Sequence, residues 1–272
     1  MSNHPAIELR DISKSFTTPR GGRYQALRNL SLTVDQGEFC AVVGPTGCGK
    51  STTLTLVSGL ERPTTGGVFI DGQPVRGIGR DIAFMFQTDA IFPWKTVIDN
   101  VLAGPKFRHA PMAQARADAH GWLQRVGLTG FEDRYPHQLS GGMRKRVALA
   151  QSLINSPRIL LMDEPFSALD VQTRAIMSNE LLGLWDLTKP AVIFVTHDLE
   201  EAIALADKVV VMTAGPAATV KATFPIDLPR PRVVQEIRFD AHFVDLYRNI
   251  WEALRSEVDA AYAQTAPKQE AA

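Results

Sequence analysis

The spacing of apolar residues predicts two kinds of β structure in the first ninety residues. Apolar and polar positions alternate between about residues 6 and 35, around a turn rich in Gly and Pro, which is typical of paired antiparallel strands. The apolar run at 67–72 ends in Asp-Gly, which favours a hairpin. By contrast, 39–43 and 81–86 are continuous apolar runs, typical of buried strands.

Helical spacing of apolar residues begins near residue 96 and predicts a helical subdomain at about 89–157. Pro111 could open one of its helices, and Gly127 lies just past the end of the same helix. Strands are expected again at 158–162 and 191–195, on either side of a helix at roughly 171–187. This alternation predicts an α/β fold with a mainly parallel sheet covered on both faces. In the helix that Pro111 could open, the apolar face would consist of Met112, Ala115, Ala119, Trp122, Leu123 and Val126.

The last part of the chain predicts a single amphipathic helix at 236–263, following a main domain at 1–235. Asp240 could cap this helix. Its apolar stripe either packs onto the core or forms a surface for a partner. Residues 264–272 are expected to form a disordered tail. The stripe consists of Phe243, Leu246, Tyr247, Ile250, Trp251, Leu254, Val258 and Tyr262.

Size and charge limit the class of protein. A chain of 272 residues suits one large α/β domain, or a domain with a subdomain. The 29 basic residues balance 29 acidic ones, so a general nucleic-acid-binding surface is not expected. No apolar run approaches the roughly 20 residues of a membrane-spanning helix. Residues 1–5 lack the features of a signal peptide, and two cysteines make no disulfide framework, so a cytosolic compartment is expected.

A phosphate-binding loop is predicted between the strand at 39–43 and a helix at 52–57. The intervening segment matches the spacing G-x-x-x-x-G-K-[ST], which cradles the phosphates of a nucleotide. Glycines let successive backbone N–H groups turn inward, and the helix N-terminus adds partial positive charge. The predicted phosphate-binding residues are Gly44, Pro45, Thr46, Gly47, Cys48, Gly49, Lys50, Ser51 and Thr52.

Three side chains of this loop have further predicted roles. Lys50 would reach the β- and γ-phosphates, and the Ser51 hydroxyl would hold Mg²⁺. The alternative is a Gly-rich turn with an unrelated lysine, which the strand–loop–helix context disfavours. Cys48 is either a small residue that the loop tolerates or a regulatory thiol.

Two carboxylates end the predicted strand at 158–162. Asp163 can hold the hydration shell of Mg²⁺ opposite Ser51, and Glu164 can polarise the attacking water as a general base. The separation in sequence allows this strand and the strand of the phosphate loop to be neighbours.

A second anion site is predicted where a basic helix begins near Arg144. Ser140 can cap the helix, while two glycines expose backbone N–H groups. An ordinary capped helix start is the alternative, and it is less favoured beside a phosphate loop. The segment consists of Leu139, Ser140, Gly141, Gly142 and Met143.

Gln87 and His197 each follow a predicted strand. A histidine in that position is usually structural, but in a phosphate-transfer site it could contact the γ-phosphate and orient Glu164. Gln87 could coordinate Mg²⁺ or the attacking water. The predicted catalytic residues are therefore Glu164, His197 and Gln87, and the predicted Mg²⁺ ligands, partly through water, are Ser51, Gln87 and Asp163.

Together these motifs make residues 6–215 resemble the ATP-binding subunits of ABC transporters. The resemblance implies a P-loop NTPase core with an antiparallel β subdomain and an inserted helical subdomain, an ABC ATPase that uses ATP and Mg²⁺. It implies that 139–143 is the signature of that family and His197 its switch histidine. Phe16 falls where an aromatic ring stacks on adenine, with Tyr24 as the alternative. The loop after the acidic strand (the D-loop) consists of Ser167, Ala168, Leu169 and Asp170.

The same resemblance implies partners and a location. Such subunits form head-to-tail homodimers, with ATP between the phosphate loop of one copy and Ser140–Gly142 of the other. They bind membrane-spanning permease subunits at the cytoplasmic face of the inner membrane, and act indirectly with a periplasmic solute-binding protein.

Within the family, the segments 37–40, 90–94 and 228–232 are similar to importers of nitrate, aliphatic sulfonates or taurine. Met143, Lys145 and Gln151 depart from the family pattern, which has glutamine, glutamine and arginine there. An exporter subunit and a soluble ABC ATPase acting on ribosomes or DNA are the alternatives. Residues 91–94 either line a groove for a helix of the membrane partner or pack against the helical subdomain.

Overall fold

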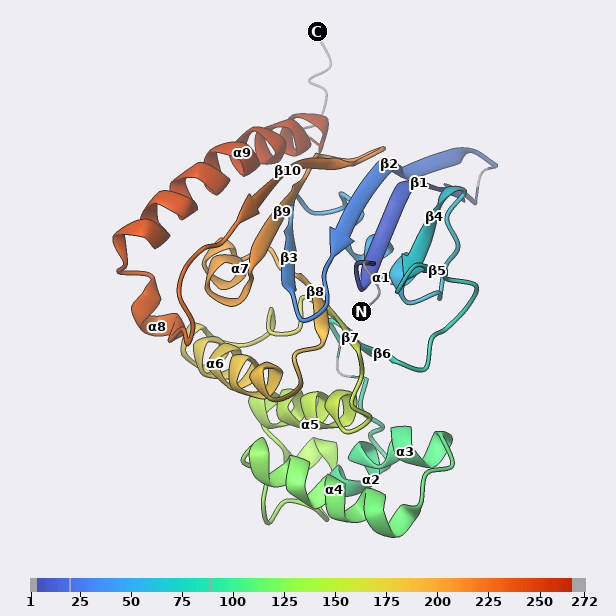
Figure 1. Ribbon diagram of the computed structural model, residues 1–272, viewed down its shortest axis with the longest axis vertical. Coiled ribbons are helices and arrows are strands. Elements are labelled where there is room, and N and C mark those ends of the chain that lie inside the picture. Colours follow the sequence, from blue (N-terminus) through green and yellow to red (C-terminus); the bar gives the residue numbers. More distant parts are fainter. Residues whose placement is uncertain (1–3, 20, 89, 266–272) are drawn as a thin grey trace, which may run out of the picture.

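Two β-sheets and a group of helices form the described part of the chain, residues 4–19, 21–88 and 90–265 of a computed structural model (Figure 1). The larger sheet carries the phosphate loop, and the smaller sheet lies beside it. In spatial order, the larger sheet consists of β10 (Val220–Pro225), β9 (Lys208–Met212), β3 (Phe39–Val43), β8 (Ala191–Val195), β7 (Ile159–Asp163) and β6 (Ile82–Met85).

The larger sheet is parallel except at one edge. β3 pairs in parallel with β8 and β9, β7 pairs in parallel with β8 and β6, and β10 alone among these strands runs antiparallel. The predicted mainly parallel sheet is therefore confirmed. The acidic strand β7 is not a direct neighbour of β3, because β8 lies between them. Parallel pairing brings the carboxyl ends of β3, β7 and β8 to one edge.

The smaller sheet is antiparallel throughout, as the alternating pattern predicts. β1 pairs with β2 on one side and β4 on the other, and β5 closes a hairpin with β4. Phe16 of β1 is directly opposite Tyr24 of β2. The strands are β1 (Ile7–Thr17), β2 (Arg23–Val34), β4 (Thr65–Ile70) and β5 (Gln73–Pro74).

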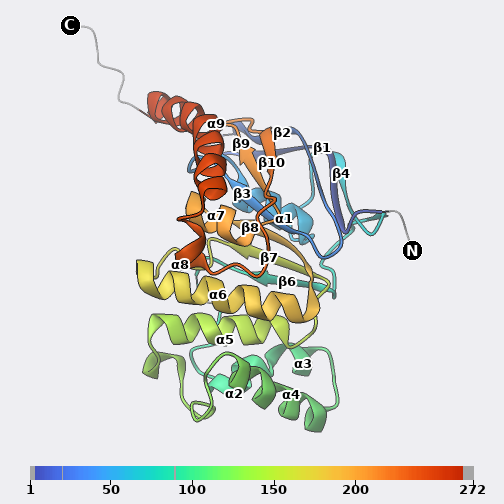
Figure 2. The ribbon, with the colours of Figure 1, turned by 60° about the vertical axis from the view of Figure 1, so that its left-hand side comes forward.

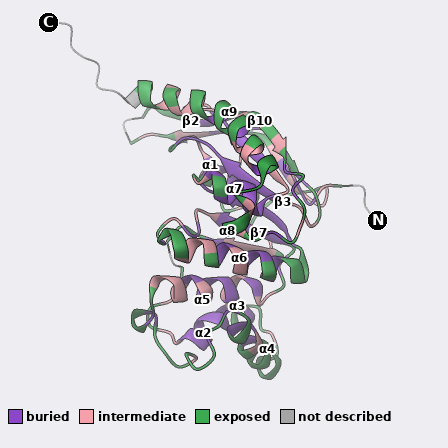
Figure 3. Ribbon diagram, turned by 90° about the vertical axis from the view of Figure 1, so that its left-hand side faces the viewer, coloured by how far each residue is buried: buried purple, intermediate pink, exposed green. Residues whose placement is uncertain are grey.

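Both faces of the larger sheet are covered. Side chains alternate along each strand, so a central strand contributes buried residues to both faces. In β3, Phe39, Ala41 and Val43 belong to one apolar cluster, while Cys40 and Val42 belong to the other. Figure 2 shows the last helix (Ala241–Thr265) beside the upper strands of the sheet and the helix Val171–Thr188 below the lower strands, and Figure 3 shows the buried strands between exposed helix faces. The helices of the core are α1 (Lys50–Val57), α6 (Val171–Thr188), α7 (Leu199–Leu205), α8 (Val234–Ile237) and α9 (Ala241–Thr265).

Most helices of the predicted helical subdomain lie together at one end of the molecule, furthest from the smaller sheet (Figure 1). Ala119 and Leu123 on α4 are buried, as predicted, but Met112 is exposed because it begins the helix at the edge of the packed face. These elements are α2 (Val97–Val101), α3 (Ala103–Phe107), α4 (Met112–Arg125), the 3₁₀ turn η1 (Pro136–Gln138) and α5 (Gly141–Leu153).

The predicted single helix at 236–263 is two helices in the structure, α8 and α9, and α9 begins after the predicted Asp240 cap and runs further than predicted. Asp240 Oδ1 accepts a hydrogen bond from the N–H of Phe243 at 3.2 Å, as the expected cap does. Its stripe packs only in part, since Trp251 and Tyr262 are 43% and 73% exposed. The helix reaches Thr265, so the predicted tail is wrong for 264–265, and 266–272 lie outside the described residues. None of the described helices combines the length and apolar character needed to cross a membrane.

Candidate active site

The predicted phosphate-binding loop lies between β3 and α1, with glycines where the backbone requires them. Gly47 and Gly49 have φ values of 80° and 96°, in the left-handed region that favours glycine. A Cβ at Gly49 would also lie 2.7 Å from a Leu27 methyl carbon. The loop therefore turns tightly and exposes backbone N–H groups at the N-terminus of α1, which suits an anion.

Lys50 holds its ammonium inside the curve of this loop. The side chain is buried, and Nζ donates to the carbonyl oxygens of Gly44 at 2.8 Å and Pro45 at 3.1 Å. A phosphate seated on the loop N–H groups would meet this charge at close range. The Cys48 thiol is buried, and burial raises its pKa, which disfavours the reactive thiolate of the regulatory alternative.

Asp163, at the end of the acidic strand β7, contacts the phosphate-binding loop although β8 separates β7 from β3. Ser51 Oγ donates to Asp163 Oδ1 at 3.0 Å, so the hydroxyl and the carboxylate face one position. Burial raises the pKa of Asp163, and the hydrogen bond from Ser51 opposes that shift. A pair of oxygen donors beside a phosphate site fits Mg²⁺, which is usually held by one or two protein oxygens together with substrate phosphates.

Glu164 is the point at which the other predicted catalytic residues converge. His197 Nδ1 lies 3.0 Å from Glu164 Oε2, and Gln87 Nε2 donates to the same oxygen at 3.5 Å. The Glu164 backbone N–H bonds to Val195 O at 2.9 Å, which ties the ends of β7 and β8 together. Glu164 has φ of 43°, an uncommon conformation for a residue other than glycine, and such strain is often found at active sites.

A cavity of about 580 Å³ joins these groups to the aromatic residues of the smaller sheet. Phe16 is half-buried, with Lys14 Nζ 4.8 Å from its ring centre, whereas Tyr24 is 43% exposed. Both rings face the cavity, so both alternatives for adenine stacking stay open. The cavity is lined by Phe16, Tyr24, Ala26, Thr46, Gly47, Gly49, Lys50, Ser51, Thr52, Gln87, Glu164 and His197.

The predicted signature segment lies outside this cavity. Ser140 caps α5, since its Oγ accepts a hydrogen bond from the Met143 N–H at 3.3 Å. A Cβ at Gly142 would lie 3.1 Å from Thr173 Cγ2, which places the segment beside the start of α6. No signature residue is among the described residues that line the cavity. Within one chain, the two predicted anion sites are therefore separate.

The predicted D-loop connects Glu164 to α6. Ser167 Oγ donates to the backbone oxygen of Glu164 at 3.0 Å. At the other end, Asp170 caps α6 by accepting from the Thr173 N–H at 3.0 Å, and hydrogen bonds from Thr173 lower the pKa of Asp170.

Comparison with known proteins decides the family. The model of the family described as ABC transporter matches residues 27–167. This chain belongs to the ABC transporter family. It is an ATP-binding protein and an ABC-type ATPase, as the sequence predicts.

The relatives of this ABC ATPase match most of its length. It is 45% identical to an uncharacterized ABC transporter ATP-binding protein of Methanocaldococcus jannaschii, over 93% of this chain and 92% of the relative. It is 44% identical to the nitrate import ATP-binding protein NrtD of Synechococcus elongatus, over 86% of each chain. Among solved structures, the ATP-binding cassette MJ0796, in a dimeric post-hydrolysis state bound to ADP and Pi, has a TM-score of 0.72 and 30% identity, and the match covers 82% of this chain and 100% of the cassette.

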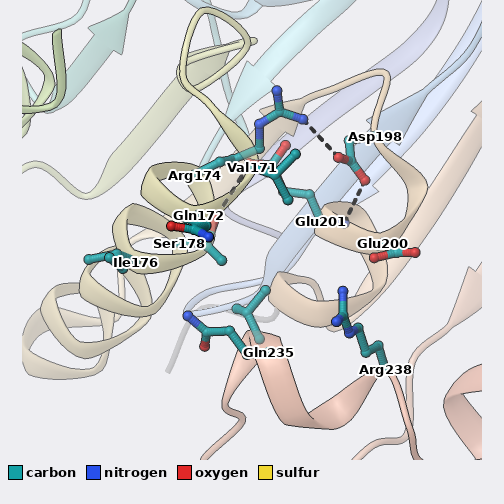
Figure 4. Close-up of a pocket in the computed structure, with 12 residues that line it drawn as sticks. Val171, Gln172, Arg174, Ile176, Ser178, Asp198, Glu200, Glu201, Gln235 and Arg238 are labelled. Carbon is teal, nitrogen blue, oxygen red and sulfur yellow. Dashed lines mark hydrogen bonds and ion pairs between the residues drawn. The ribbon is translucent and has the colours of Figure 1, made fainter.

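Arg174 of the ABC ATPase links the predicted D-loop to Asp198, the residue after His197, a connection that the sequence did not predict. One guanidinium nitrogen donates to Asp198 Oδ2 at 2.9 Å, and the other donates to Leu169 O at 3.1 Å. Asp198 directly follows His197, so one guanidinium contacts both loops. Figure 4 shows Arg174 reaching from α6 to Asp198, at a groove of about 290 Å³ between α6, α7 and α8.

Glu201 is a second residue that the sequence did not reveal. Its carboxylate accepts from Thr196 Oγ1 at 2.6 Å and from Ser178 Oγ at 3.4 Å. Burial raises its pKa to about 7. An acidic residue in the first turn of a helix is ordinary in a sequence, and only packing shows that this one is enclosed next to the His197 loop.

The apolar segment 91–94 divides between the two predicted roles. Ile91 is 8% exposed and belongs to the core, whereas Trp94 is 71% exposed. The ring of Phe92 lies 5.6 Å from that of Trp94. Core packing thus accounts for the first residue of the segment and leaves the tryptophan on the surface.

Proposed function

We propose that this ABC ATPase energises an import complex for a small solute such as nitrate, an aliphatic sulfonate or a taurine-like compound. The observation that carries the ATPase role is the contact of His197 and Gln87 with one oxygen of Glu164, beside the phosphate loop. The 44% identity to a nitrate import protein supports import and an anionic solute. An exporter subunit and a non-transport ATPase are the alternatives.

The side chains of the cavity suit separate roles in phosphate transfer. Glu164 would take a proton from the attacking water, while His197 and Gln87 hold the carboxylate in place. Lys50 would neutralise charge on the β- and γ-phosphates. Ser51 and Asp163, with Gln87, would hold Mg²⁺, which supplies further positive charge to the phosphates when bound.

A second copy of the chain would complete the site. The signature at the start of α5 lies outside the cavity of its own chain and offers a capped helix N-terminus to an anion. The related cassette MJ0796 is dimeric. A head-to-tail dimer would place Ser140–Gly142 of each copy against the nucleotide of the other. The further partners in this proposal are membrane-spanning permease subunits at the cytoplasmic face of the inner membrane and, indirectly, a periplasmic solute-binding protein.

The test replaces the proposed general base. Glu164→Gln keeps the size of the side chain and removes the proton acceptor, so turnover should fall by about a hundredfold or more while ATP still binds. Because ATP is no longer consumed, the variant should form an ATP-dependent dimer, measured by light scattering. Glu252→Gln, on an exposed position of α9, is the matched control and should behave like the wild type. Unchanged turnover in Glu164→Gln would contradict the proposal.

A further inference from the structure

Lys145 is a buried cation in the second turn of α5, the helix that begins with the signature. Its exposed fraction is 3%, and Nζ donates to the backbone oxygen of Gln87 at 3.0 Å. A buried ammonium is costly unless it has acceptors, so this hydrogen bond holds the segment around Gln87 against α5. The side chain of Gln87 in turn reaches Glu164.

The three consecutive basic residues of α5 point to three different places. Arg144 donates to Leu139 O at 2.8 Å, within the signature itself. Arg146 donates to Val126 O at the end of α4, and pairs with Glu180 of α6 at 2.5 Å. A solvated basic face does not describe this arrangement. Lys145 is the member of the three whose described hydrogen bond reaches the catalytic cavity.

We propose that Lys145 is a positioning residue that couples the signature to the catalytic centre of its own chain. Ser140 at the N-terminus of α5 faces one nucleotide of the dimer, and Lys145, five residues on, holds the glutamine that contacts Glu164. A shift of α5 when the signature meets a nucleotide is transmitted to Gln87 through this hydrogen bond. The inference deepens the proposed function and rests on its dimer.

A purely structural role for Lys145 makes a different prediction. Filling space in the packing of α5 needs only a side chain of similar length, and methionine supplies one without a charge. Glutamine is shorter but can still donate a hydrogen bond to a carbonyl oxygen. Lys145→Met and Lys145→Gln therefore separate the packing of this position from its hydrogen bond.

The experiment measures kcat, KM for ATP and the Hill coefficient of the full-length ATPase. Lys145→Met should lower kcat by about tenfold or more, because misplacing a catalytic group is costly, while KM stays within about twofold. Its Hill coefficient should fall towards one, and Lys145→Gln should recover part of both losses. Lys106→Met, at an exposed lysine of α3, is the matched control and should change neither quantity.

Two results would overturn the inference. One is a folded Lys145→Met variant with wild-type kcat and Hill coefficient. The other is a fall in activity that Lys145→Gln does not relieve and that follows a loss of thermal stability in both variants. The dimer is tested separately, by the ATP-dependent dimerisation of the Glu164→Gln variant, in which Lys145 is unchanged. If Glu164→Gln does not dimerise with ATP, the result counts against the proposed function. If kcat and the Hill coefficient are unchanged in Lys145→Met, the result counts against the coupling alone.

Discussion

At the scale of single residues, the buried Glu201 carboxyl near His197 contributes to the dependence of stability on pH. Glu201 is 7% exposed, and burial raises its pKa from 4.5 to about 7. The folded state therefore binds a proton more tightly than the unfolded state does. This contribution to stability is complete below pH 4.5 and is lost as the pH rises to about 7.

Glu201→Gln should remove this dependence on pH. The shift of the Glu201 pKa corresponds to about 3 kcal/mol of unfolding free energy between pH 4.5 and pH 7. Unfolding by urea at pH 5 and pH 8 would measure it, and the variant should show a smaller difference between the two conditions. The neighbouring exposed Glu200, changed to glutamine, is the control and should keep the wild-type difference. An equal pH dependence in wild type and Glu201→Gln would contradict the assignment.

At the scale of elements, Ser140 at the start of α5 has two roles, as the cap of the helix and as part of the proposed anion site. Ser140 stabilises the helix by accepting from the Met143 N–H, and it belongs to the proposed anion site. These properties can be separated, because aspartate caps a helix about as well as serine does but carries a negative charge.

Ser140→Asp should leave thermal stability unchanged and strongly reduce ATP hydrolysis, since its charge repels the phosphates of the partner's nucleotide. Ser140→Ala should instead cost about 1 kcal/mol of stability through the lost cap. Thr96 caps α2 by accepting from the Asp99 N–H at 3.3 Å, so Thr96→Asp places the same charge at a helix start away from the cavity. That control should keep its ATPase activity. Full activity in Ser140→Asp would argue against a nucleotide contact in trans.

At the scale of the whole molecule, Trp94 is an exposed aromatic side chain seven residues after Gln87. The Trp94 side chain is 71% exposed, which leaves a large apolar surface in water. It lies in the segment that precedes α2, the first helix of the helical subdomain. Exposed aromatic residues of this kind are common at protein interfaces. The proposed occupant is a short helix of the membrane-spanning partner, which is one of the two alternatives that the sequence left open.

Trp94→Asp should uncouple transport from hydrolysis. The isolated ATPase should hydrolyse ATP at the wild-type rate, because Trp94 does not line the nucleotide cavity. In the assembled complex, the increase in ATPase activity caused by nitrate, a sulfonate or taurine should be lost. Phe107→Asp, at a residue of α3 that is 73% exposed, compares a second aromatic position on the same helical group. Equal loss of activity in the isolated protein and in the complex would remove this idea.

The sequence by itself determined the nucleotide chemistry of this protein. The phosphate loop depends on local backbone geometry, in which glycines at fixed spacing permit φ values such as the 96° of Gly49. The order of strands and helices likewise follows from local periodicity, which is why the parallel sheet, the antiparallel sheet and the Asp240 cap are where the pattern predicts.

The tertiary structure alone decided which distant residues meet. It placed β8 between the acidic strand and the phosphate-loop strand, enclosed Glu201, and joined Lys145 to Gln87 across 58 positions of sequence. It also left Trp251 exposed within a stripe that reads as apolar throughout. Burial and long-range hydrogen bonds depend on how complete elements pack together. A local pattern predicts which face of each helix or strand is apolar, but it does not predict which other element packs against that face.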